Sequence, residues 1–198
     1  MNEPTLFILS GPPGAGKTTR GDSLLPAHLQ GLHVFHSDEY LLDRQAFYAN
    51  WLPEGTSKEA DRLAREDLEN HFLDLLSGSL ENRCHFAYET QIRNLDQWQI
   101  MAFFQKAGFL LQMAYIGLDN PLTSAVRVQK RIEKGGHREV SPELAMECYH
   151  ANLLMLNQYF SLFDELHLYD GTGTSLLTLA SLKKGAVTEA LAAEQQPD

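Results

Sequence analysis

The sequence predicts an α/β fold in three layers, with a mostly parallel sheet of five or six strands between helices on both faces. Three observations support this prediction. Short apolar segments alternate with longer segments of helical periodicity, which is typical of strand–helix–strand units. The first apolar segment, LFILS, lacks the alternation of a half-exposed strand and is expected to be covered on both faces. A glycine-rich loop follows it directly.

The elements are expected in the following order. Strands are predicted at 5–10, 32–36, 84–88, 109–118 and 165–169, with a last edge strand at 176–182. Helices are predicted at 17–28, 58–76, 95–107, 122–134 and 142–160. The helix at 58–76 carries six apolar residues on one stripe: Leu63, Ala64, Leu68, Phe72, Leu75 and Leu76. Ser141 and Pro142 are typical of an N-cap and a first helical position.

The 198 residues suit a single domain. We expect it to span 1–188, with a lid segment at about 120–140 and a flexible, polar tail at 189–198. The segment 44–55 is aromatic and irregular, and it is expected to form either part of a substrate cavity or a separate hydrophobic cluster under a loop.

Composition narrows the function classes. A formal net charge of -10 argues against broad binding of nucleic acid or of anionic membranes. No segment approaches the roughly 20 apolar residues of a membrane span, and the N-terminus does not look like a signal peptide. We therefore expect a cytoplasmic protein, with Cys84 and Cys148 as small core residues rather than a disulfide.

A phosphate-binding loop is predicted directly after the first strand. The segment matches G-x-x-x-x-G-K-[ST] at every fixed position: Gly11, Pro12, Pro13, Gly14, Ala15, Gly16, Lys17, Thr18 and Thr19. Glycine lets the backbone amides approach an anion, and the following helix adds its positive end. Lys17 is expected to reach the β- and γ-phosphates of ATP, and the Thr18 hydroxyl to ligate Mg²⁺.

Acidic residues follow two other predicted strands, where an open parallel sheet faces its ligand. Asp38 is a candidate general base that accepts the proton of an attacking hydroxyl, or alternatively a cap of the following helix. Glu89 and Thr90 are candidates for binding acceptor hydroxyls or assisting Mg²⁺; the alternative is a solvated strand end.

A locally basic segment stands out on this acidic chain, since five of its sixteen Lys and Arg residues lie between Arg127 and Arg138. Arg127 and Arg131 are four residues apart and share a helix face. They are expected to form a lid over the transferring phosphoryl group, with Gly135-Gly136 as its hinge. The alternative is a solvated basic helix surface.

The ordered motifs GPPGAGKTT, HSDEYL, FAYETQ, AVRVQKRIEKGGHREVSPE and HLYDG resemble the zeta toxin-like P-loop kinases, over about residues 5–171. The resemblance implies a P-loop kinase fold, with ATP and Mg²⁺, and a sugar 3′-hydroxyl of UDP-N-acetylglucosamine as acceptor. It gives Lys17 and Thr18 the phosphate-loop roles, Asp38 that of the base, and Arg127 and Arg131 those of phosphate-clamping arginines.

In the same resemblance, Glu89 and Thr90 match the region that holds the sugar nucleotide. Larger zeta toxins space their two arginines farther apart, so Arg138 is the alternative to Arg131 and a candidate substrate-binding residue. They also place one residue between the glutamate and the threonine, which are adjacent here. The chain therefore resembles a compact branch of the family, in which the acceptor is open.

Two function classes follow. The first is an ATP-dependent kinase that phosphorylates a hydroxyl of a small anionic metabolite, with UDP-N-acetylglucosamine as one candidate. The second is a nucleotide-dependent ATPase switch that acts on a protein partner. The kinase could also be the toxin of a toxin–antitoxin pair, with an antitoxin protein as its partner.

Overall fold

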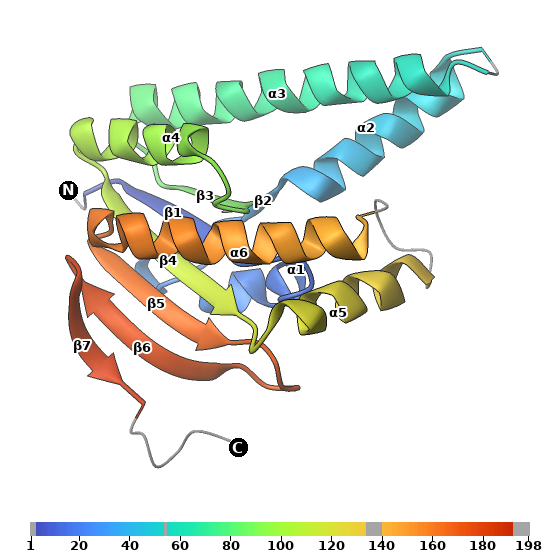
Figure 1. Ribbon diagram of the computed structural model, residues 1–198. Coiled ribbons are helices and arrows are strands. Elements are labelled where there is room, and N and C mark those ends of the chain that lie inside the picture. The colour runs from blue at the N-terminus through green and yellow to red at the C-terminus, as the bar shows by residue number, and fades with distance from the viewer. Residues whose placement is uncertain (1–2, 54, 134–139, 192–198) are drawn as a thin grey trace.

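A computed structural model describes residues 3–53, 55–133 and 140–191 (Figure 1). Seven strands form one sheet in the order β2-β3-β1-β4-β5-β6-β7. The first five of these pair in parallel, whereas β6 and β7 pair antiparallel. The strands are β1 (Thr5–Ser10), β2 (Phe35–His36), β3 (Phe86–Thr90), β4 (Leu110–Gly117), β5 (Glu165–Asp170), β6 (Leu177–Lys183) and β7 (Ala186–Ala190).

Helices pack on both faces of this sheet. They are α1 (Lys17–Arg20), α2 (Ser37–Trp51), α3 (Ser57–Asn82), α4 (Leu95–Lys106), α5 (Pro121–Glu133) and α6 (Pro142–Tyr159), with short 3₁₀ turns at Gly21–Leu24, Ala27–Leu29 and Phe160–Leu162. Side chains of α3, α4 and α6 pack on one face of the sheet in a large core that includes Trp98, Phe104 and Met155. A smaller core lies on the other face and includes Phe7 and Leu9. The three-layer α/β prediction is therefore confirmed, with seven strands in place of five or six.

Local capping explains where two helices begin. The Ser141 side chain accepts a hydrogen bond from the Leu144 amide and Pro142 opens α6, as the sequence predicts. The Asn94 side chain caps α4 in the same way through the Gln97 amide. Such caps satisfy amides that have no partner within the helix.

The structure corrects two predicted elements before β3. The helix expected at 17–28 ends as an α-helix at Arg20 and continues as 3₁₀ turns, since Gly21 and Pro26 interrupt it. The segment 44–55, expected to be irregular, is helical through Trp51. Phe47 and Trp51 are 48% and 68% exposed on α2. Neither residue lines the cavity described below, and both are too exposed to form the alternative, a hydrophobic cluster under a loop.

Two further differences concern the C-terminal tail and one cysteine. The chain stays in a strand to Ala190, two residues into the segment predicted as a flexible tail. Cys84 precedes β3 and is exposed, so its prediction as a core residue is wrong, whereas Cys148 is buried as predicted.

Within the described residues, none of the helices combines the length and the apolar character that crossing a membrane requires.

Candidate active site

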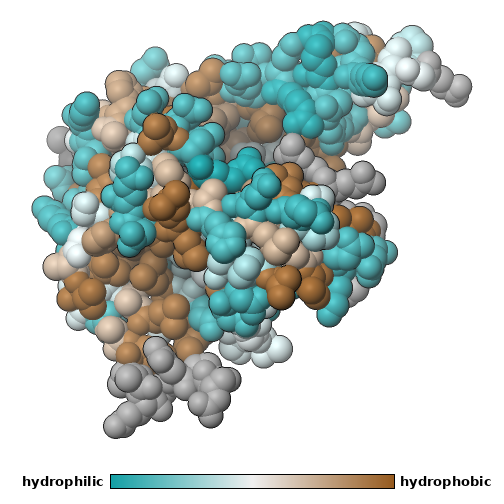
Figure 2. Space-filling view, viewed as in Figure 1, coloured by the Kyte–Doolittle hydropathy of each residue, from teal (hydrophilic) through white to brown (hydrophobic). Residues whose placement is uncertain are grey.

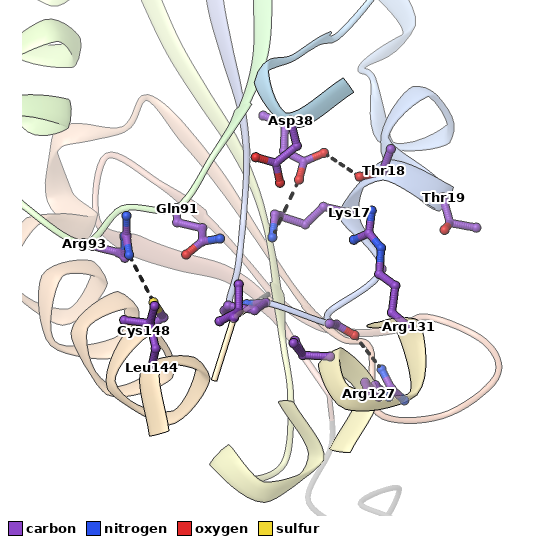
Figure 3. A pocket seen from close by; sticks show the side chains of 16 residues that line it. Lys17, Thr18, Thr19, Asp38, Gln91, Arg93, Arg127, Arg131, Leu144 and Cys148 are labelled. Carbon is purple, nitrogen blue, oxygen red and sulfur yellow. Dashed lines mark hydrogen bonds and ion pairs between the residues drawn. The ribbon is translucent and has the colours of Figure 1, made fainter. Parts of the chain in front are cut away.

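A cavity of about 440 Å³ opens beyond the carboxyl ends of β1 and β3 (Figure 3). The loop after β1, the start of α2, the end of β3, and helices α5 and α6 all contribute to its wall. The lining residues are Pro13, Gly14, Gly16, Lys17, Thr18, Thr19, Asp38, Glu89, Gln91, Arg93, Arg127, Val128, Arg131, Val140, Leu144 and Cys148. The carboxyl edge of a parallel sheet is where ligands of open α/β folds bind.

The glycine-rich loop joins β1 to α1 in a shape that its sequence requires. Gly11 has a φ of 147°, and a Cβ atom there would lie 2.2 Å from the Ile116 carbonyl oxygen of β4. Any side chain at this position would therefore push the loop away from the sheet. Gly16 is the N-cap of α1, so the loop ends at the positive end of a short helix.

Lys17 is buried where the loop meets the cavity. Its Nζ atom donates hydrogen bonds to the carbonyl oxygens of Gly11, at 3.0 Å, and Pro12, at 3.2 Å, and lies 3.7 Å from Glu89 Oε1. Burial lowers the pKa of Lys17, and the negative charges of Glu89 and Asp38 offset this only in part. The ammonium group is held by two neutral carbonyl oxygens, which an incoming phosphate anion could replace.

Glu89 is the point where three other side chains meet. It ends β3 and pairs in register with Leu9 of β1 and with His36 of β2. Its Oε2 atom accepts hydrogen bonds from Thr18 Oγ1 at 3.0 Å and from His36 Nδ1 at 2.8 Å. Burial would raise the pKa of Glu89, but His36, Lys17 and Thr18 outweigh it and hold that pKa below its usual range. The same hydrogen bond raises the pKa of His36.

Asp38 lies at the same end of the cavity as Lys17 and Thr18 (Figure 3). It is the second residue of α2, whose N-cap is His36, so Asp38 itself is not the cap. Its side chain is solvent-accessible and belongs to the cavity wall. A carboxylate in this position could accept a proton from a ligand bound in the cavity.

The two arginines of α5 both line the cavity, as their spacing predicts, but they differ in their contacts. Arg127 donates to the carbonyl oxygens of Gly14 at 3.2 Å and Gly171 at 2.8 Å, and also to that of Thr172. Its guanidinium is therefore engaged by the backbone. Arg131 is exposed, and its guanidinium points toward Lys17 in Figure 3. The other predicted arginine, Arg138, lies outside the described residues.

The far wall of the cavity consists of residues that the sequence analysis did not identify. Gln91 and Arg93 follow β3, and Leu144 and Cys148 lie on α6. Arg93 Nη1 lies 3.2 Å from the Cys148 sulfur. Gln91 and Arg93 come two and four residues after Glu89, and their place beyond a strand end could have indicated them. The α6 residues carry no such signal.

Thr90 lies outside the cavity, whereas Thr18 and Glu89, the other residues predicted to ligate or assist Mg²⁺, line it. Thr90 is not part of the cavity wall; its hydroxyl accepts a hydrogen bond from Gln97 of α4 at 3.1 Å. Among the described residues, no group of three or more histidine, cysteine and acidic side chains could hold a metal by itself. Thr18 and Glu89 nevertheless form an oxygen pair, which suits Mg²⁺ that keeps several waters and binds substrate phosphates.

The family model described as zeta toxin matches residues 1–176 of this chain. No curated protein sequence matches it.

Solved structures with a similar fold include the following three. One, from the PezAT chromosomal toxin–antitoxin system of Streptococcus pneumoniae, is 16% identical, with a TM-score of 0.60 over 91% of this chain and 72% of that one. The AvrRxo1-ORF1:-ORF2 structure with ATP is 16% identical, with a TM-score of 0.65 over 94% of this chain and 60% of that one. An inferred kinase of Chloroflexus aurantiacus is 20% identical, with a TM-score of 0.52 over 73% of this chain and 76% of that one.

Proposed function

This chain belongs to the zeta toxin family, and on that premise we propose that it is a kinase that transfers the γ-phosphate of ATP to a hydroxyl of a small anionic metabolite. One observation carries the proposal. Lys17, Thr18, Asp38 and Glu89, which come from three separate elements, line one cavity at the carboxyl edge of the sheet. A phosphate-binding loop and a separate carboxylate are what phosphoryl transfer to a hydroxyl requires.

In the proposed reaction, the loop amides and Lys17 bind the β- and γ-phosphates. Asp38 accepts the proton of the acceptor hydroxyl while the hydroxyl oxygen bonds to the γ-phosphorus, and the bond to the β–γ bridging oxygen breaks to release ADP. Arg131 stabilises the charge on the transferring group. Thr18 and Glu89 would hold Mg²⁺, directly or through water, and Mg²⁺ would supply charge neutralisation on the phosphates.

The second part of the cavity would bind the acceptor. Arg93 contributes a positive charge, Gln91 an amide, and Leu144 an apolar contact. This mixture suits a molecule with an anionic group and hydroxyls, such as a nucleoside diphosphate sugar. UDP-N-acetylglucosamine is the first candidate to test. Glu89, which the family resemblance relates to binding of the sugar nucleotide, lines the same cavity.

The test is ATP turnover in the presence of candidate acceptors, with mass spectrometry to detect the gain of one phosphate. The panel contains UDP-N-acetylglucosamine, other UDP-sugars, NAD and common sugars. Asp38→Asn should retain ATP binding but lose phosphorylation by roughly 10²- to 10⁴-fold, because the amide cannot accept the proton. Asp43→Asn is the matched control, since Asp43 is exposed on the same helix and does not line the cavity.

An Asp38→Asn protein that phosphorylates its acceptor at the wild-type rate would disprove the role of Asp38. ATP hydrolysis without any phosphorylated acceptor, together with a protein that binds differently in ATP and ADP, would instead support the ATPase switch.

We also propose that the kinase is the toxin of a toxin–antitoxin pair. Its support is family membership and a fold shared with a structure from a toxin–antitoxin system. Expression should arrest growth, and Lys17→Ala should abolish the arrest because the phosphates lose their buried cation. Lys106→Ala, an exposed position on α4, is the control. Arrest that persists in Lys17→Ala would exclude a toxicity that depends on the phosphate loop.

A further inference from the structure

His36 stands directly opposite Glu89 in the sheet. The two residues are register partners in the parallel pair β2–β3, so their side chains leave the sheet on the same face. The His36 Nδ1 to Glu89 Oε2 distance of 2.8 Å is that of a charge-assisted hydrogen bond. His36 is also the N-cap of α2, two residues before Asp38.

The fold leaves room for this ring on its other side. A Cβ atom on Gly21 would lie 3.6 Å from His36 Cε1 and 2.7 Å from Leu9 Cδ2. A side chain at position 21 would therefore clash with Leu9, whereas its Cβ atom would only reach van der Waals contact with the imidazole. The ring thus lies between the backbone at Gly21 and the Glu89 carboxylate.

His36 differs from the other partners of Glu89 in one respect. Lys17 and Thr18 line the cavity, and His36 does not. In the proposed function, on which this inference rests, Lys17 turns to the ATP phosphates and Thr18 to Mg²⁺. His36 is then the partner that stays on Glu89, because it has no access to the bound nucleotide.

We propose that His36 is a positioning residue that holds the Glu89 carboxylate toward Mg²⁺-ATP after Lys17 and Thr18 have left it. Without His36, the carboxylate would be free to rotate when the nucleotide binds. The effect should therefore appear in the contribution of Mg²⁺ to ATP binding and be absent from ATP binding without the metal.

Calorimetry of ATP binding, with EDTA and with Mg²⁺, measures the two states separately. His36→Phe retains a ring but cannot donate a hydrogen bond, and we expect it to reduce the Mg²⁺-dependent gain in ATP affinity by about ten-fold while affinity in EDTA changes by less than about two-fold. His36→Asn places an N–H near the position of Nδ1 and should restore most of the gain. If the phenyl ring does not fit and the protein unfolds, His36→Leu takes its place.

His33→Ala is the control, since this exposed histidine packs edge-on against His36 without lining the cavity. A His36→Phe protein with the wild-type Mg²⁺-dependent gain would overturn the inference. Equal losses of affinity with and without Mg²⁺ would do so too, because they indicate a merely structural role. Wild-type protein that binds no ATP would instead overturn the proposed function itself, so the two failures are distinguishable.

Discussion

At the scale of single residues, Glu89 shows how an ionised side chain is kept inside the site. Its carboxylate is largely buried, yet it has an ammonium, a hydroxyl and an imidazole as partners. Removing any one partner leaves the remaining groups to compensate for a buried charge, which is costly. Lys17 and Glu89 depend on each other for the same reason, since each is a buried charge that the other partly neutralises.

The pKa shifts of Glu89 and His36 predict how this pairing depends on pH. The pKa of Glu89 is lowered from 4.5, so its contribution to the free energy of unfolding is present above pH 4.5 and is lost as the pH falls through the folded value. The pKa of His36 is raised from 6.5, so its contribution is present below pH 6.5 and is lost as the pH rises through the folded value.

The free energy of unfolding of wild type minus that of Glu89→Gln should therefore be largest between pH 4.5 and 6.5, the two reference values. We expect a difference of about 2 kcal/mol there, the scale of hydrogen bonds to a charged group. Above pH 6.5 only part of this difference in free energy is lost, because Lys17 and Thr18 remain partners of Glu89. Urea unfolding across pH measures it, with Glu69→Gln, exposed on α3, as the control. A difference that does not vary with pH would contradict the assignment.

At the scale of elements, the phosphate loop depends on strand β4 as much as on its own sequence. Gly11 touches the backbone of Ile116, and Ser124 of α5 donates a hydrogen bond to the Pro13 carbonyl oxygen at 2.7 Å. The loop is therefore shaped from both sides before any ligand arrives. Such preorganisation reduces the entropic cost of binding.

Gly11→Ala tests this packing. We expect it to lower the free energy of unfolding by about 3 kcal/mol or more, because positive-φ strain adds to a clash with backbone that cannot move away. Gly31→Ala is the control: its φ is +89° and a Cβ atom would meet nothing within 4 Å, so only about 1 kcal/mol of strain is expected. Urea unfolding of both variants gives the comparison. Equal losses would show that the contact with β4 is unimportant.

At the scale of the whole molecule, the strand order places β1 between β3 and β4, so the loop, Glu89 and α5 converge from different parts of the chain. On the face drawn in Figure 2, hydrophilic and hydrophobic residues are interspersed. Apolar patches often mark binding sites of other kinds. The features that distinguish this one are its shape and its charges.

Ligand binding should stabilise the molecule as one cooperative unit. At an ATP concentration 100-fold above its dissociation constant, the gain is about 2.7 kcal/mol, which corresponds to a rise in Tm of roughly 5 to 10 °C for a chain of this size. Differential scanning fluorimetry with ATP and Mg²⁺ measures it. Lys17→Ala should abolish the rise. A Tm that ATP leaves unchanged in wild type would contradict nucleotide binding.

Local patterns predicted the fold class and one wall of the cavity. The buried strand, the glycine loop and the acids at strand ends carry their signals within a few residues, and Lys17, Thr18, Asp38 and Glu89 do meet. By contrast, α2 has no strong apolar stripe, because most of its residues are partly or fully exposed, and periodicity could not reveal it.

Tertiary contacts decided the rest. The contribution of Cys148 depends on where α6 crosses the sheet, and the contact of His36 depends on strand register; neither is visible in a single sequence. The Arg127 contacts require a loop 44 residues farther along the chain. Helical spacing predicted that the two arginines share a face, and both line the cavity, but spacing could not tell which guanidinium would bind backbone carbonyl oxygens.

The contacts of Arg127 also limit how this protein can close on a ligand. Through this side chain, α5 is tied to the phosphate loop and to the turn after β5. These contacts hold the first half of α5 against the sheet. Arg131, one turn farther along α5, is exposed in the cavity wall, so in the proposed function it could approach a bound phosphate by changing its rotamer. Closure on a ligand would then require a movement of the Arg131 side chain, while the first half of α5 stays in place.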